Sequence, residues 1–206
     1  MIDQAHGPIV AMFGGCHSNT KGPVGKAIIG FTTWPWRWFK PKAVSTHSSV
    51  GFRFQDGHEV IFEAREGKSW QGPIPVEKVE AWVRRDPKTR RFTKYYVPNH
   101  YMTMGTMQLK YDLCMFNLRV WIYSIAQLPR MGLRKYLPFL PINQTPDKVV
   151  CSEAATIILH PQVPVLRYAK KKKADLVTPF LYERAMRKIC QPSLHRPADA
   201  SDAYKN

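Results

Sequence analysis

The chain has 206 residues, of which 44% are hydrophobic and 12% aromatic, and its 31 lysines and arginines against 15 aspartates and glutamates give a net charge of +16. A chain of this length can bury a core without disulfides or a structural metal, so the composition excludes a wholly disordered protein. The positive charge predicts an anionic partner. Nucleic acid, acidic lipid and the acidic polymers of a cell wall all meet that description.

The pattern of apolar residues predicts one α+β domain over residues 1–190, followed by a disordered tail over 191–206. Two segments rich in proline, 34–41 and 127–148, are expected to be irregular. The first predicted elements are a buried strand at 8–13 closed by two glycines, a helix at 24–34 and a β-hairpin within 47–65. They are followed by a proline-led helix at 75–85, a strand at 91–97, a helix at 102–123 and a buried helix at 149–159.

The clearest pattern lies between residues 47 and 65, where two alternating segments flank the turn signal Gln55-Asp56-Gly57. Alternation places His47 and Glu63 on the same, less apolar face of this hairpin. A wide loop would set the two residues directly opposite each other. A tight two-residue turn would split the apolar faces, so we expect a wider loop or a bulge.

The four cysteines, Cys16, Cys114, Cys151 and Cys190, form neither a CxxC pair nor a zinc-binding cluster with histidines. We therefore expect no metal and no cofactor, and free thiols typical of a reducing compartment. The N-terminal residues lack the pattern of a signal peptide, and no apolar stretch predicts a transmembrane segment. We expect synthesis in the cytoplasm, with any delivery to an outside target by a phage particle or by lysis.

Among these cysteines, Cys151 has the position best suited to chemistry. It lies in the first turn of a predicted apolar helix, where free N–H groups and the helix dipole favour a thiolate. A nucleophilic thiolate needs a base, and His47 at the start of a strand is the best candidate. The carboxylate of Glu63 on the adjacent strand could orient that imidazole.

Each of these residues also has a simpler interpretation. Cys151 could be a small buried apolar side chain, and His47 could be a surface histidine. Glu63 could form a solvated pair with Arg53 across the hairpin. The residue types alone leave these alternatives open.

Four segments in the order THSSVGFRF, VIFEAREG, KYDL and VVCSEAA resemble the motifs of the circularly permuted papain-like cysteine hydrolases. This superfamily includes the NlpC-type cell-wall peptidases and the lecithin:retinol acyltransferases. The resemblance covers about residues 8–180. It implies a papain-like fold, in which a central antiparallel sheet packs on the helix that carries the cysteine, with the histidine before the cysteine in the chain.

The resemblance also implies roles for particular residues. Cys151 attacks the substrate, His47 acts as base and then as acid, and Glu63 orients His47. Tyr111, in the KYDL segment, is expected to contribute to substrate binding. The third polar position varies among relatives, so His58 is the alternative to Glu63, although the apolar pattern places it on the other face.

An aromatic segment just before the expected base contains Trp34, Trp36 and Trp38. These side chains could bind substrate by stacking on sugar rings, or could lie at a lipid headgroup boundary. The alternative is a structural cover over the core.

The function expected from these observations is a thiol hydrolase that cleaves an amide bond, with bacterial cell-wall peptides as the substrate class. The basic surface would hold the enzyme on an anionic cell-wall polymer or a lipid surface, and association with a phage tail would suit the missing export signal. The alternatives are a lipid-directed acyl hydrolase or acyltransferase of the same fold, and a non-catalytic basic protein of a virion or bound to nucleic acid. No motif that reads a nucleic-acid sequence is present, so such binding would be nonspecific.

Overall fold

The computed structural model describes residues 3–33, 45–65, 70–116, 122–123, 148–159 and 177–192. The aromatic segment with Trp34, Trp36 and Trp38 lies outside the described residues. So do residues 127–147 of the segment that we expected to be irregular, and residues 193–206 of the expected tail.

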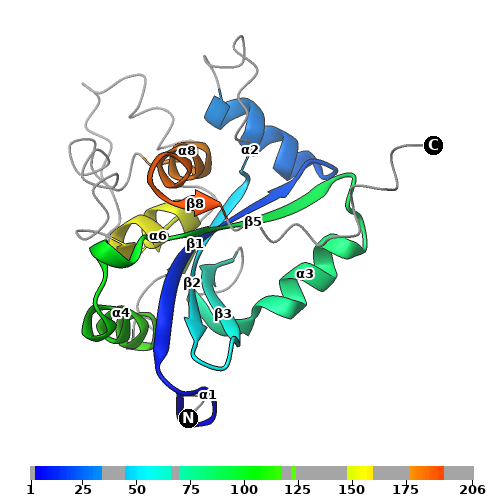
Figure 1. Cartoon of the computed structure of the whole chain (residues 1–206). Coiled ribbons are helices and arrows are strands. Elements are labelled where there is room, and N and C mark those ends of the chain that lie inside the picture. The colour runs from blue at the N-terminus through cyan, green and yellow to red at the C-terminus, as the bar shows by residue number, and fades with distance from the viewer. Residues whose placement is uncertain are drawn as a thin grey trace, which may run out of the picture.

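One antiparallel sheet of six strands, in the order β4-β3-β2-β1-β5-β8, forms the centre of the molecule (Figure 1). Its strands are β1 (Ile9–Asn19), β2 (His47–Phe54), β3 (Glu59–Ala64), β4 (Trp70–Pro75), β5 (Arg90–Tyr96) and β8 (Gln191–Pro192). Two further short strands, β6 (Ile122–Tyr123) and β7 (Lys148–Val149), pair with each other in parallel. The α+β class is therefore confirmed.

Helices cover both faces of this sheet. The helices within the described residues are α1 (Asp3–His6), α2 (Pro23–Thr33), α3 (Val76–Arg84), the 3₁₀-helix η2 (Asn99–Tyr101), α4 (Met104–Phe116), α6 (Cys151–Leu159) and α8 (Pro179–Ile189). Figure 1 shows α4, α6 and α8 on one side of the sheet and α3 on the other. Within the described residues, no helix has both the length and the apolar character needed to cross a membrane.

Alternation along the strands produces two apolar layers. The main core includes Phe52 and Phe62 and lies between the sheet and helices α4, α6 and α8. A smaller cluster, in which Phe13 and Ile61 pack with Val79 of α3, lies on the opposite face. The period of two along each strand thus decides which side chains face which layer.

Strand β1 continues through the two glycines at which we expected it to end, and it reaches Asn19. Gly14 and Gly15 do not make a turn here but permit close packing on both faces. A Cβ on Gly14 would lie 2.6 Å from the hydroxyl oxygen of Tyr182, and a Cβ on Gly15 would overlap the Ser49 side chain. The prediction was wrong because glycine in a strand can mark a close approach as well as a turn.

The predicted β-hairpin is confirmed, with the apolar faces as expected. Its register pairs Ser49 with Glu63, so Glu63 lies diagonal to His47 and not directly opposite. In the loop, the Gly57 N–H donates to the Phe54 carbonyl at 3.0 Å, and Gly57 has a φ of 88°. Such a wider loop with a glycine in the left-handed region keeps the two faces matched.

Other boundaries differ because short strands pair with distant partners. The last predicted helix begins at Cys151, since Lys148–Val149 form β7. The helix predicted to reach residue 123 is described as far as Phe116, and Ile122–Tyr123 form β6. The first residues of the expected tail, Gln191–Pro192, pair with β5. Two-residue strands of this kind carry no local pattern that a sequence reading could detect.

Candidate active site

Cys151 is the first residue of α6, a helix that packs on β2 and β3. The Val150 N–H donates to a carboxylate oxygen of Glu153 at 3.4 Å, and the Ala154 N–H donates to the Val150 carbonyl at 3.0 Å. This is the arrangement of a capped helix start. The thiol therefore lies beside backbone N–H groups that have no partner within the helix. It is also buried, with 3% of the residue exposed.

His47 is the first residue of β2, and it contacts both of the other expected residues. Its Nε2 lies 2.8 Å from Oε2 of Glu63, and its ring lies close enough to Cys151 for that residue to raise its pKa. The structure thus brings together Cys151, His47 and Glu63, which come from three separate segments of the chain. Glu63, and not His58, is the third member of this group.

The pKa of His47 reflects its two partners. Burial by itself would lower the pKa, but the charge of the Cys151 thiolate and the hydrogen bonds to Cys151 and Glu63 outweigh it and raise the pKa to about 10. The imidazole is therefore protonated at neutral pH. A protonated imidazole is the kind of neighbour that favours the nucleophilic form of a cysteine.

Glu63 is a buried carboxylate held by cations. Burial would raise its pKa, but the hydrogen bond from His47 and the charges of His47 and Arg65 lower it to about 2. The Arg65 Nε forms an ion pair with Oε1, while Oε2 faces His47. Glu63 is consequently ionised over the whole physiological range.

The sequence reading missed His17, which stands directly opposite His47 in the pairing of β1 with β2. Its Nε2 lies 2.9 Å from the Ser49 Oγ and 3.8 Å from Oε2 of Glu63, and its ring packs edge-on against that of His47. Burial lowers its pKa to about 3, so the ring is neutral. The sequence would have indicated this histidine only if the predicted strand had been extended through Gly14 and Gly15.

His17, His47 and Glu63 are also groups of the kinds that bind metal ions, and their ligand atoms lie within 4.8 Å of one another. The same atoms make the hydrogen bonds of the cluster, between His47 and Glu63 and between His17 and Ser49.

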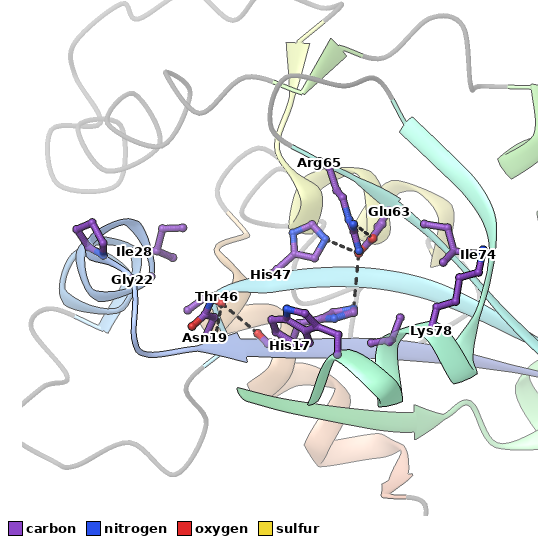
Figure 2. A pocket seen from close by; sticks show the side chains of 14 residues that line it. His17, Asn19, Gly22, Ile28, Thr46, His47, Glu63, Arg65, Ile74 and Lys78 are labelled. Atoms are coloured by element: carbon purple, nitrogen blue, oxygen red, sulfur yellow. Dashed lines mark hydrogen bonds and ion pairs between the residues drawn. The ribbon is translucent and has the colours of Figure 1, made fainter. Parts of the chain in front are cut away.

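A pocket of about 620 Å³ opens beside this cluster, between the start of α2 and helix α3 (Figure 2). Figure 2 shows His17, His47 and Glu63 grouped at its base. The walls combine apolar side chains, among them Ile28, Ile74, Val79 and Trp82, with the cations Arg65 and Lys78. Its size suits a small substrate or part of a larger one.

Cys151 is not among the described residues that line this pocket. His47 lines the pocket and also contacts the thiol, so it is the link between them. Alkylation of the Cys151 sulfur tests whether small molecules reach it from this pocket.

Two other residues considered from the sequence lie away from the site. Tyr111 is 1% exposed in the main core, where its ring packs against Phe52 at 5.3 Å and Phe62 at 5.4 Å between centroids. The expectation that it binds substrate has no support from this position. His58 stacks on His6 at 4.1 Å, at the far end of the hairpin from His47.

The three remaining cysteines provide an internal comparison for Cys151. Burial raises the pKa of Cys16, Cys114 and Cys190, in the last case to about 12. They are the protonated, unreactive kind of buried thiol.

The chain has no significant match to a protein-family model, a curated protein or a solved structure.

Proposed function

We propose that the protein is a cysteine hydrolase that cleaves an amide bond, with Cys151 as nucleophile, His47 as acid and base, and Glu63 as the group that orients His47. The observation that carries the proposal is the contact of one imidazole with both a thiol at a helix start and a buried carboxylate. The order of motifs and the antiparallel sheet packed on α6 support a permuted papain-like fold.

In the first half of the proposed reaction, the Cys151 sulfur attacks the carbonyl carbon and forms a C–S bond. The backbone N–H of Cys151 would stabilise the oxyanion, a contribution of about 3 kcal/mol in comparable sites. The C–N bond then breaks as His47 gives its proton to the leaving amine. In the second half, water attacks the thioester while His47 takes a proton, and the thiol is released.

The environment of His47 suits this exchange of roles. The negative charge of Cys151 is a major reason for its raised pKa. Acylation removes that charge, so the pKa of His47 falls and the imidazole becomes able to give up its proton and later accept one from water. Glu63 remains ionised throughout and holds the ring.

For the substrate class we propose the peptides of bacterial cell walls. The pocket pairs the apolar residues Ile74 and Val79 with the cations Arg65 and Lys78, a combination that suits a peptide with free carboxylates. The net charge of +16 would hold the enzyme on an anionic wall polymer. Delivery by a phage particle or by lysis completes this proposal.

A second candidate is a lipid-directed acyl hydrolase or acyltransferase. The observation that favours it is the presence of the apolar residues Ile28, Ile74 and Trp82 in the lining of the pocket. An ester-linked acyl chain would then replace the peptide. Turnover of purified cell-wall peptides against turnover of phospholipid vesicles distinguishes the two.

The test of the catalytic assignment is alkylation by iodoacetamide between pH 5 and 9 with peptide mapping, in buffer with EDTA. We expect Cys151 to react before Cys16, Cys114 and Cys190, since its thiolate is paired with a protonated His47. Chelation should leave the rate unchanged. In assays of cell-wall peptide hydrolysis, His47→Ala should lower activity by about 10²–10⁴-fold.

The matched control is His58→Ala, which removes a histidine of the same hairpin far from the thiol. It should alkylate and hydrolyse like the unmodified protein. Equal, slow labelling of all four cysteines, or hydrolysis that survives Cys151→Ala, would contradict the proposal and favour a non-catalytic basic protein.

A further inference from the structure

His17 is the part of the cluster that the proposed mechanism does not use. It comes from β1, on the opposite side of β2 from the strand that carries Glu63. Its side chain is 7% exposed and lies against His47 and Ser49 of β2, with the Phe92 ring of β5 at 4.6 Å between centroids. A polar ring in such a place must have its hydrogen bonds satisfied locally.

The surroundings of His17 select one of its two neutral tautomers. Its Nε2 lies near two oxygens, the Ser49 Oγ at 2.9 Å and Oε2 of the ionised Glu63 at 3.8 Å. A lone pair on Nε2 would face the negative carboxylate and be repelled by it. A proton on Nε2 is attracted by the carboxylate and donates to the Ser49 hydroxyl.

The neutral state of His17 also matters, because a second imidazolium would compete for the same carboxylate. The charged or titratable groups that face it are Glu63 of β3, His47 of β2 and Arg65. Burial, His47 and Arg65 all oppose its protonation, and only Glu63 favours it. The carboxylate therefore receives a dipole from His17 and a full charge from His47.

We propose that His17 is a positioning residue. Its neutral imidazole, on β1, holds the Glu63 carboxylate and the His47 ring in place and does not compete with His47 for the negative charge of Glu63. This inference rests on the proposed function, in which Glu63 orients His47. It adds a fourth side chain to the cluster, and it assigns to that side chain an action through Glu63 and not on the substrate.

The experiment compares His17→Phe, which keeps the ring volume, with His17→Gln, which keeps an N–H donor. The rate of Cys151 alkylation is measured from pH 5 to 9, and the titration of His47 is followed by NMR of its ring. For His17→Phe we expect alkylation at pH 5–6 to fall by about two- to tenfold, the range of one hydrogen bond. The pKa of His47 should fall in the same variant, and His17→Gln should restore both quantities.

A double-mutant cycle tests whether the effect passes through Glu63. In a Glu63→Gln background, His17→Phe should cause little further change, because the carboxylate that it braces is already gone. Circular dichroism and thermal unfolding confirm that each variant is folded. If His17→Phe does not fold, His17→Gln is compared with His17→Asn instead. The side-chain amide of glutamine reaches the position of the His17 Nε2, whereas that of asparagine does not.

Several outcomes would overturn the proposal. One is a folded His17→Phe protein in which the pH profile of alkylation and the titration of His47 are unchanged. Another is a loss of alkylation rate that is equal at every pH and equally large in the Glu63→Gln background. Failure of the proposed function is a separate result, seen as unselective labelling of Cys151 in the unmodified protein. The NMR titration of His47 still decides the role of His17 in that case.

Discussion

At the scale of single residues, the site separates two histidines that differ only in their neighbours. His47 lies beside the Cys151 side chain and the Glu63 carboxylate, and its pKa is raised to about 10. His17 touches a hydroxyl and lies farther from the same carboxylate, and burial lowers its pKa to about 3. One charged and one neutral imidazole side by side are compatible with a single negative charge on Glu63, whereas two charged rings would repel.

These shifts predict how the stability of the fold depends on pH. His47 has a folded pKa above its unfolded value of 6.5, so its contribution is complete below pH 6.5 and is lost as the pH rises through about 10. His17 has the opposite shift. Between pH 6.5 and about 3 the unfolded chain binds a proton that folded His17 does not, so stability falls as the pH falls. Glu63 adds a further loss between pH 4.5 and about 2.

We therefore expect His17→Gln to flatten the decline of stability between pH 6.5 and 4.5. The slope should change by up to about 1.4 kcal/mol per pH unit, the value for one proton. Urea unfolding at several pH values measures the free energy of unfolding of both proteins. Parallel curves for the two proteins in this window would show that His17 is protonated in the folded state.

At the scale of elements, the site depends on how closely β1 and β2 approach each other. A Cβ on Gly51 of β2 would overlap the Phe13 ring of β1. Phe13 belongs to the small core under α3, on the face that also carries His17 and His47. A larger side chain at Gly51 would have to displace this ring and the strand that positions the histidines.

The same substitution should consequently have opposite effects at two glycines. Gly51→Ala should lower the free energy of unfolding by about 1–3 kcal/mol because of the overlap with Phe13. Gly30→Ala in α2, where no described atom lies within 4 Å of the added Cβ, should raise it by about 0.5–1 kcal/mol. Urea unfolding of the two variants is the measurement. Equal destabilisation by both would contradict the packing of β1 on β2 described here.

At the scale of the whole molecule, the net charge of +16 predicts attraction to anionic polymers. Long-range attraction to anionic polymers is screened by salt, whereas a buried hydrogen-bonded pair is screened much less. Binding and catalysis should therefore respond differently to ionic strength.

We expect cosedimentation with anionic cell walls at low salt and release as sodium chloride is raised from about 50 to about 500 mM. Alkylation of Cys151 should stay nearly constant over the same range. DNA of any sequence should compete for the basic surface at low salt. Binding that resists high salt, or that depends on the DNA sequence, would contradict the view that the charge acts nonspecifically.

Much of the candidate site could be predicted because its signals are local. Alternation within residues 47–65 was sufficient to place His47 and Glu63 on one face, and the apolar segment after residue 149 was sufficient to place Cys151 near a helix start. Alternation and helical periodicity come from covalent geometry and burial, so they can be read within a short window.

Tertiary structure alone decided the rest. The pairing of β1 with β2 brings His17 opposite His47, and the packing of α4 buries Tyr111 in the core. The register that sets Glu63 diagonal to His47 was likewise settled by the loop and the neighbouring strands. Such contacts join segments far apart in the chain, and their free energy depends on how complementary surfaces pack. The sequence by itself thus determined the chemical groups and their local faces, while the assembly of the sheet determined which of them meet.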